Sequence, residues 1–316
     1  MLAVRKILFP TDFSRCSEKA MNHALLFAKS FGAELHFLHA VVLRQGPLTD
    51  TQEDFPGEEE LLRHMFEVSG SELGKLTAGD ETAEITVREE TRRGYSAGAV
   101  ILDYADEIDA DMIVMGTHGY RGPMRFFLGS VAEEVVRHAK CPVLTLGKQE
   151  EPADLHAWTK ILAPVDFSEH SERAVRTAKE LAARYGASVE LLHVIQSQPL
   201  PTIYGPAAIG EGVLERLRTQ SLTEMEHLSA RAGGPEVEIE NTVTYGYPSA
   251  RINEFAEQNG CDLIVLPTHG LTAIERFLLG STTEKVVRGA HVPVLTVKSF
   301  GKDLVVRSGA EEAKAS

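Results

Sequence analysis

The chain of 316 residues is long enough for two ordinary domains, each with a core of its own. Its hydrophobic fraction of 43% and its charged fraction of 25% are typical of a soluble globular protein. The formal net charge of -14 argues against nucleic acid as a main partner, because contacts to phosphate backbones need clustered Lys and Arg. It does not argue against a small phosphate ligand, which backbone N–H groups at a helix start can hold.

Short apolar runs alternate with longer amphipathic stretches in the first half of the chain, which is the pattern of βαβ units around a parallel sheet. We expect strands, in chain order, at 6–10, 34–41, 84–91, 111–116 and 142–146. We expect helices at 17–32, from about 58, at 96–108 and at 130–139. Ser14 or Ser17 is expected to cap the first helix, and Gly32 to end it.

The second half of the chain repeats the first. KILFPTDFS (6–14) recurs as KILAPVDFS (160–168), and DMIVMGTHG (111–119) recurs as DLIVLPTHG (262–270). FGAELHFLHA and AKCPVLTL also recur, in the same order, as YGASVELLHV and AHVPVLTV. The repeat predicts an α/β fold of two tandem Rossmann-like domains, each a five-stranded, parallel, doubly wound sheet.

Composition places the domain boundaries. We expect the first domain at 1–147 and the second at 159–298, joined by a polar linker at 148–158. The tail, 299–316, has no apolar period and is expected to be disordered. The segment 196–212 is irregular and rich in Pro and Gly, which is typical of a lid or a partner surface.

The first residues of the chain and the spacing of its cysteines are consistent with a cytoplasmic protein. The start, MLAVRKILFP, runs straight into an expected strand, so we expect no signal peptide. No apolar run in the sequence approaches the roughly 18 to 20 residues of a membrane span, and no membrane partner is expected. The spacing of Cys16, Cys141 and Cys261 predicts neither a disulfide framework nor a metal site, and buried free thiols in a reducing cytoplasm are expected.

The carboxyl ends of three expected strands should converge on one crevice, because open α/β sheets bind ligands there. The first strand ends at Pro10-Thr11-Asp12, the second near His39-Ala40 and the fourth at Met115-Gly116.

A glycine motif follows the fourth strand. Gly116, Gly119 and Gly129-Ser130 form G-x2-G-x9-G-S, which ends where the next helix begins. Glycines let the backbone approach a pyrophosphate closely, and Ser130 is expected to cap the helix while the first free N–H groups bind an anion. The spacing is neither the G-x-x-x-x-G-K-[ST] phosphate loop nor the G-x-G-x-x-G dinucleotide fingerprint.

With PTDFS, LHA, IVMGTHG, the helix-starting GS and KCPVLTL, the chain resembles the universal stress protein family in its tandem-domain form, apart from the tail. The resemblance implies ATP binding, with Asp12 and the backbone of Ala40 at the adenine. It further implies that ribose and phosphates are held by Gly116, Gly119, Gly129, Ser130 and Val131. The expected nucleotide site also includes Pro10, Thr11, Met115 and His118.

The resemblance also carries expectations about assembly and activity. The last strands, PVLTL and PVLTV, would pair across a pseudo-twofold interface between the domains, and a further homodimer of tandem chains is expected. The leading hypothesis is a stress-associated, nucleotide-dependent switch or chaperone-like module with at most slow ATP hydrolysis, in which Mg²⁺ could bridge the phosphates. A nucleotide-independent interaction protein and a slow ATPase remain the alternatives.

The second copy departs from the motif. Pro267 stands where Gly116 stands in the first copy, and Val165 where Thr11 stands. Proline removes a backbone donor, and losing one hydrogen bond to a charged phosphate costs on the order of 1.5–3 kcal/mol. We expect a weaker second site or a purely structural domain. The residues that would form such a site are Asp166, Val194, Gly270, Gly280 and Ser281.

Histidines raise the question of zinc. His39 and His193 close the second strand of each copy, and His36 and His23 lie near His39 in the sequence. Residues three apart on a strand point to opposite faces, so His36 and His39 are not a natural pair. Packed or hydrogen-bonded histidines are favoured over a metal site, and no metal is predicted.

Two further pairs of repeated residues have open roles. His118 and His269 either lie near the phosphates or serve the structure of the loop. Arg125 and Arg276 either contact phosphate or form salt bridges. No convincing pair of nucleophile and base is found, so no catalytic residue is predicted.

Overall fold

The computed structural model describes residues 1–42, 58–118, 128–147, 158–196, 211–269, 279–298 and 300–305. The chain divides into two compact units. The first unit is Val4–Lys148, and the second is Gln149–Ser316 together with Met1–Ala3. The predicted linker, 148–158, lies almost wholly outside the described residues, as does most of the irregular segment at 196–212.

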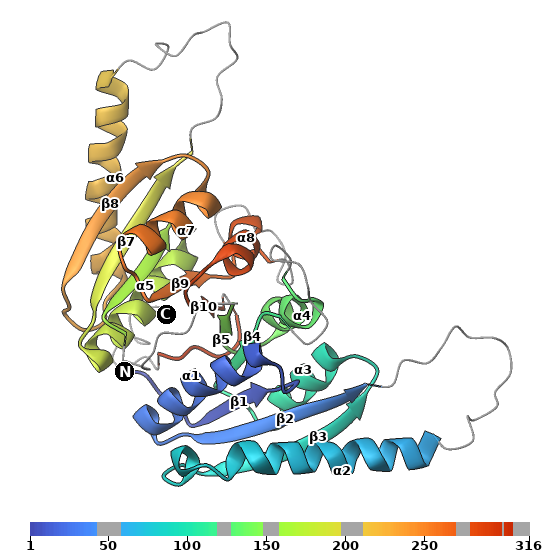
Figure 1. The fold of residues 1–316 in the computed structure, drawn as a ribbon. Coiled ribbons are helices and arrows are strands. Elements are labelled where there is room, and N and C mark those ends of the chain that lie inside the picture. The colour runs from blue at the N-terminus through green and yellow to red at the C-terminus, as the bar shows by residue number, and fades with distance from the viewer. Residues whose placement is uncertain are drawn as a thin grey trace, which may run out of the picture. The chain divides into compact units, whose positions relative to one another are not determined.

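The first unit alternates strands with helices (Figure 1). Its strands are β1 (Lys6–Pro10), β2 (Glu34–Val42), β3 (Val87–Gly94), β4 (Met112–Gly116) and β5 (Val143–Leu146). Its helices are α1 (Arg15–Phe31), α2 (Glu58–Thr77), the short 3-10 helix η1 (Asp80–Thr82), α3 (Ala97–Glu107) and α4 (Ser130–His138). The predicted elements are therefore confirmed, with boundaries shifted by a few residues.

The strands of the first unit pair in parallel in the order β3-β2-β1-β4-β5. The path from β1 to β3 runs one way along the sheet, and the path through β4 to β5 runs the other way. Right-handed crossovers therefore place α1 and α2 on one face and α3 and α4 on the other. α2 packs on β2 and β3, and α3 packs on α4. The doubly wound fold follows from the strand order.

Local sequence explains where the first helix begins and ends. Ser14 is the N-cap of α1 and accepts the N–H of Ser17 at 3.3 Å. Gly32 ends the helix in the left-handed region with φ 62°, and its N–H donates to Ala28 O. Both predicted boundary signals are confirmed.

The second unit repeats this architecture, with strand order β10-β9-β6-β7-β8. Its strands are β6 (Lys160–Val165), β7 (Ser188–Ile195), β8 (Ile239–Tyr245), β9 (Leu263–Pro267) and β10 (Val294–Val297). Its helices are α5 (Glu169–Tyr185), α6 (Glu211–Ala232), α7 (Pro248–Gln258) and α8 (Ser281–Gly289). The expected pairing between the last strands of the two units stays a prediction.

The first residues of the chain pair with Leu304 and Val305 within the second unit. Leu2 forms an antiparallel bridge with Val305, and Ala3 N–H donates to Leu304 O at 2.9 Å. Leu304 and Val305 are buried. The disorder expected of the tail therefore does not hold for residues 300–305, because apolar side chains and backbone pairing hold them in place. Among the helices that the structure describes, none is long and apolar enough to cross a membrane.

Candidate functional site

The carboxyl end of β1 lies where the strand order of the first unit reverses. β1 lies between β2 and β4. It pairs with β4 through Ile7↔Met112 and Leu8↔Ile113, well before β4 ends at Gly116. This edge is the switch point at which open α/β sheets bind their ligands.

Gly116 presents its backbone N–H to this edge. Ile113 and Thr117 donate their N–H groups toward β5, to Pro142 O at 3.0 Å and to Leu146 O at 2.8 Å. N–H directions alternate along a strand, so the N–H of Gly116 points to the other side, toward β1. Because β1 ends at Pro10, this donor points past the end of the strand.

β2 presents Ala40 to the same edge from the opposite side. Leu38 O points toward β1, because it accepts the N–H of Thr11 at 2.9 Å. Ala40 lies two residues further along β2 and therefore faces the same way, beyond the end of β1. The backbone of Ala40 and the N–H of Gly116 thus face one another across the end of β1. Pro10 and Met115 are buried beside them.

The turn after β1 places a carboxylate at this edge. Phe13 adopts a left-handed φ of 61°, and its N–H donates to Thr11 Oγ1 at 3.0 Å. The Asp12 carboxylate is exposed and accepts the N–H of Ser14 at 3.1 Å. The turn therefore holds an exposed acceptor at the start of α1, where the helix dipole favours a negative charge.

The start of α4 supplies backbone donors. The helical ladder begins with the N–H of Glu133 donating to Gly129 O at 2.9 Å, so the N–H groups of Ser130 and Val131 precede it. The side chain of Ser130 is exposed. A helix start of this kind is suited to an anion such as phosphate.

The two described glycines of the first motif sit where backbones approach closely. A β-carbon on Gly129 would lie 2.7 Å from Thr117 O, and one on Gly116 would lie 2.9 Å from Cys16 Sγ and 3.1 Å from Cys16 O. The N–H of Gly129 already donates to Thr117 O at 2.9 Å. Gly129 therefore supplies space for the start of α4, whereas Gly116 supplies both space and a donor.

The predicted cap of α4 is wrong. Gly129, with φ -60° and ψ 139°, is the N-cap, and Ser130 is the first helical residue. The hydrogen bond from Gly129 to Thr117 O holds the last extended residue against the end of β4, and the helix begins at Ser130, one residue earlier than a serine cap at this position would give. Gly119, Gly270, Arg125 and Arg276 lie outside the described residues.

The second unit has the same edge without the leading donor. Ile264 and Thr268 donate their N–H groups toward β10 at 2.9 and 3.0 Å, so the nitrogen of Pro267 faces the side of β6. Proline fits there because no ladder hydrogen bond is lost. Gly280 repeats the contact of Gly129, since its N–H donates to Thr268 O at 2.8 Å.

The other described residues of the expected second site lie at positions equivalent to those in the first unit. Val194 lies in β7 at the position of Ala40 in β2, and is buried. Ser281 is the exposed first residue of α8. Asp166 follows β6 and is half-buried, whereas Asp12 is exposed.

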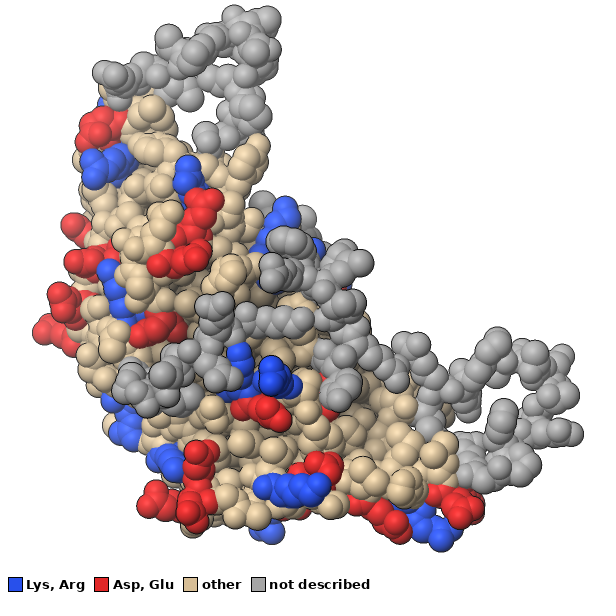
Figure 2. Space-filling model, in the orientation of Figure 1, with Lys and Arg blue, Asp and Glu red and all other residues tan. Residues whose placement is uncertain are grey.

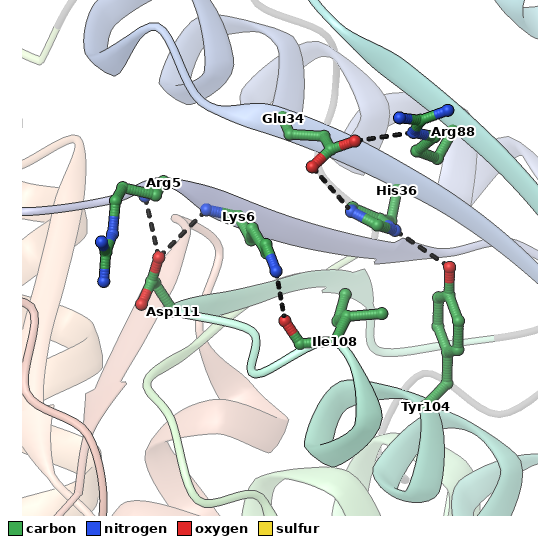
Figure 3. Close-up of polar contacts among 8 residues, drawn as sticks. All are labelled: Arg5, Lys6, Glu34, His36, Arg88, Tyr104, Ile108 and Asp111. Carbon is green, nitrogen blue, oxygen red and sulfur yellow. Dashed lines mark hydrogen bonds and ion pairs between the residues drawn. The ribbon is translucent and has the colours of Figure 1, made fainter.

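A polar network occupies the opposite, amino-terminal edge of the first sheet (Figure 3). Asp111 accepts the backbone N–H groups of Arg5 and Lys6 at 2.8 and 3.0 Å. His36 lies 2.9 Å from Tyr104 Oη and 3.5 Å from Glu34 Oε2. Burial lowers the pKa of His36. His36 therefore belongs to a structural network away from the carboxyl ends of the strands.

His39 is oriented differently from His36, as the alternation of the strand predicts. Its Nδ1 lies 2.8 Å from Thr11 O, and its ring stacks on Phe13. His193 repeats the hydrogen bond at 2.9 Å from Val165 O.

His23 lies on α1, and burial lowers its pKa to about 4. Within the described ranges, no group of His, Cys, Asp and Glu is placed to hold a metal ion.

His118 and His269 are tied to the loops that carry them. His118 Nδ1 lies 2.8 Å from Thr117 Oγ1, and His269 Nδ1 lies 3.0 Å from Thr268 Oγ1. Thr117 Oγ1 also donates to Leu146 O at 3.1 Å. These contacts assign both histidines a part in the structure of the strand end.

Sequence reasoning missed Phe13 and Cys16. Phe13 and its counterpart Phe167 both have φ above 60°. The repetition of DFS in both copies was the available signal. Cys16 packs against Gly116, and its thiol donates to Leu146 O at 3.3 Å. Its counterpart in the repeat is His170, so the repeat gave no signal for Cys16.

Each unit is thus a doubly wound, parallel α/β domain of the Rossmann-like class, with a glycine-bearing loop at its strand switch point. The pattern that defines the universal stress protein family matches the chain twice, over residues 3–146 and 157–298. The chain belongs to the universal stress protein family, with two of its domains in tandem.

Relatives cover one or both domains. A universal stress protein of Mycolicibacterium smegmatis is 27% identical over 303 residues, which are 92% of this chain and 96% of that protein. One from Methanocaldococcus jannaschii is 35% identical over 148 residues, 46% of this chain and 84% of that protein. The crystal structure of one from Archaeoglobus fulgidus, 23% identical, has a TM-score of 0.67 and covers 94% of this chain and 97% of its own. That similarity shows a shared fold.

Proposed function

We propose that the first unit binds ATP at the carboxyl end of β1. The adenine lies between the Asp12 carboxylate and the backbone of Ala40, and the phosphates lie at the start of α4 near Ser130 and Val131. Gly116 donates its N–H to the ribose or the phosphates. Mg²⁺, when bound with the nucleotide, would neutralise negative charge on the phosphates. The membership of the chain in the universal stress protein family supports adenine nucleotide as the ligand.

One observation carries this proposal. The N–H of Gly116 and the backbone of Ala40 face the same edge from two sides, while Gly129 brings the start of α4 against the end of β4. A β-carbon at Gly129 would lie only 2.7 Å from Thr117 O, so a larger residue would push the start of α4 away from the end of β4. The combination of a peptide donor, an exposed carboxylate and an open helix start matches a ligand with both a base and phosphates.

The bound nucleotide serves as a switch for a protein partner, with at most slow hydrolysis. Nucleic acid is not the proposed partner. The net charge of -14 supports this, as does the face in Figure 2, where the coloured Lys and Arg side chains are interspersed with Asp and Glu. A homodimer of tandem chains and a cytoplasmic location complete the proposal. The free thiols of Cys16, Cys141 and Cys261 support a reducing compartment.

The second unit favours a different role. Pro267 offers no N–H at the position of Gly116, and this supports a weaker ligand site or an interaction domain that needs no nucleotide. The first unit remains the proposed nucleotide site.

Native mass spectrometry of the purified full chain, followed by calorimetric titration of ATP, tests the proposal. One ATP bound per chain, with affinity lost in Gly116→Pro, is the expected result. The matched control is Pro267→Gly, which should leave binding to the first unit unchanged. A chain that binds no adenine nucleotide by either measurement refutes the proposed function.

A further inference from the structure

β8 is the outermost strand in the sheet of the second unit. The strand order of this unit ends at β8, which pairs in parallel with β7 over its whole length. Among the strands that the structure describes, none pairs with its other side (Figure 1). β3 holds the equivalent place in the first unit. Edge strands of this kind present backbone groups that can pair with another chain.

The outward backbone groups of β8 belong to alternate residues. Val189 N–H donates to Glu238 O at 2.8 Å, and Gly246 N–H donates to Ile195 O at 3.1 Å, so the even-numbered residues of this stretch face β7. Because the directions alternate along a strand, the N–H and C=O groups of the odd-numbered residues face away from the sheet. These residues are Ile239, Asn241, Val243 and Tyr245. In the described part of the chain, no hydrogen bond engages the outward groups of the first three.

The two edge strands differ in charge. Five of the eight residues of β3 are charged, namely Arg88, Glu89, Glu90, Arg92 and Arg93. Of the seven residues of β8, only Glu240 is charged. Charged side chains on an edge strand protect it against pairing with another chain. The repeat therefore contains the same edge twice, with this protection in the first unit and without it in the second.

The backbone of β8 can pair with a second copy of itself. In an antiparallel pair about a twofold axis at Thr242, the outward groups of Asn241 lie opposite those of Val243 in the other copy. Such a pair exchanges two N–H···O=C hydrogen bonds, and the axis generates it twice. The edge of one chain thus supplies the partners that the edge of the other lacks.

The side chains of β8 suit the same arrangement. Ile239 lies opposite Tyr245 of the other copy, and pairs of aromatic and β-branched residues stabilise antiparallel sheets. The exposed carboxylate of Glu240 lies opposite Thr244, so it faces no like charge. It also comes to the end of β8 at which Arg251 Nε donates to Tyr245 O at 3.0 Å in the other copy. Acidic and basic groups therefore meet at both ends of the pair.

The equivalent pairing of β3 is unfavourable. Glu90 has the position of Thr242, because each pairs with the equivalent leucine of the neighbouring strand. About a twofold axis at Glu90, this carboxylate lies opposite its own copy, and Arg88 lies opposite Arg92. Like charges directly opposite one another destabilise a strand pair. Self-pairing is thus a property of β8 alone among these two edge strands.

We propose that β8 is the interface of a homodimer, in which the β8 strands of two chains pair antiparallel about a twofold axis at Thr242. The same surface of both chains meets itself, as in other closed dimers. The inference rests on the homodimer within the proposed function and gives it an interface, but it does not depend on the nucleotide site.

Val243→Pro in the full-length chain tests the interface. Size-exclusion chromatography with light scattering should give wild type twice the mass of one chain. The variant removes an outward N–H and leaves the hydrogen bonds to β7 in place, and edge strands tolerate proline at such positions. Its mass should fall to that of one chain. The matched control is Thr91→Pro, which changes the equivalent outward position of β3 and should leave the dimer intact.

Thr242→Cys tests the register of the pair without proline. The two introduced thiols would face each other across the axis as a non-hydrogen-bonded pair, whose α-carbons lie about 4.5 Å apart, a distance that a disulfide spans. Mild oxidation of the full chain should therefore give a covalent dimer on a non-reducing gel. Glu90→Cys, the equivalent change in β3, should remain a single chain. The native cysteines are buried, which keeps them out of this reaction.

The outcomes are distinguishable. Wild type with the mass of one chain refutes the homodimer and this inference together, and an extended segment of another protein is then the remaining occupant of β8. A dimer that survives Val243→Pro, that is lost equally in Thr91→Pro, or that gives no disulfide in Thr242→Cys overturns β8 as the interface and leaves the homodimer standing. A dimer that binds no ATP refutes the nucleotide site alone.

Discussion

The ring of Phe13 stacks on the imidazole of His39, with 4.6 Å between ring centroids and 29° between planes. His39 Nδ1 in turn lies 2.8 Å from Thr11 O. His39 therefore contacts the residue before Asp12 through a hydrogen bond and the residue after it through the ring stack. Phe167 and His193 repeat the relationship with centroids 4.3 Å apart. Bulky residues rarely adopt a left-handed backbone, and the ring stack explains why both Phe13 and Phe167 do so.

Phe13→Ala and Phe13→Gly should separate the stack from the backbone strain. Both variants lose the ring, but alanine keeps a β-carbon at φ 61° while glycine adopts that φ freely. We expect both to destabilise the first unit, with Phe13→Gly more stable than Phe13→Ala by about 1 kcal/mol. Urea denaturation of the full chain measures this. Equal stabilities, or a less stable glycine variant, would contradict the account of strain.

Gly129→Ala and Gly280→Ala form a matched pair. The added β-carbon would lie 2.7 Å from Thr117 O in the first unit and 3.2 Å from Thr268 O in the second. The first contact forces the start of α4 away from β4, so Gly129→Ala should weaken ATP binding by about tenfold or more. Gly280→Ala should leave it unchanged. Calorimetry decides, and intact ATP binding in Gly129→Ala would contradict the proposed place of the phosphates.

The fold could be predicted from the sequence because local and global signals agree. Ser14 and Gly32 have the chemistry of helix ends, and the repeat supplies each strand twice, which removes most ambiguity. The described part of the tail was mispredicted, because Leu304 and Val305 are held by pairing with the distant residues Leu2 and Ala3. Spacing along the chain carries no sign of such a contact.

Only part of the candidate site could be predicted from the sequence. The motif pointed to Gly116 and Gly129, but it could not show that the Gly129 N–H is used by Thr117 O, which moves the cap of α4 from Ser130 to Gly129. The substitution of Thr11 by Val165 was visible in the repeat. The hydrogen bond from Ser171 Oγ to Asp166 Oδ1 was not, because both copies have a serine at this position and only the structure shows which acceptor each serine uses.

Asp111→Ala should destabilise the first unit without changing its ligand site. Asp111 Oδ2 accepts two backbone N–H groups at the start of β1, and the residue is 9% exposed. Removing the carboxylate leaves these groups without that acceptor, at a cost of about 3 kcal/mol. Asp111→Asn keeps one acceptor oxygen and should cost less. Urea denaturation measures the stability.

The matched control for Asp111→Ala is ATP titration at 25 °C of the still-folded variant. The network of Figure 3 lies at the amino-terminal edge of the sheet, opposite Asp12 and Gly116, so affinity should stay within about twofold of wild type. A large loss of affinity would show that the two edges are coupled.

His23 should make the first unit sensitive to mild acid. Burial lowers its pKa from an ordinary value of 6.5 to about 4. Between these values the unfolded chain binds a proton that the folded chain does not, so the free energy of unfolding falls as the pH falls through this window. At pH 5 the loss relative to pH 7 is about 2 kcal/mol.

His23→Gln removes this titration and should make the drop in stability between pH 7 and pH 5 smaller by about 2 kcal/mol. Burial also lowers the pKa of His36 from its ordinary value of 6.5, so the variant should keep some acid sensitivity between pH 7 and pH 5. Urea denaturation at both pH values measures the difference. An equal fall in the free energy of unfolding in variant and wild type would contradict this account. It would show that the folded chain tolerates a charged His23, because water or a nearby acceptor compensates for its burial.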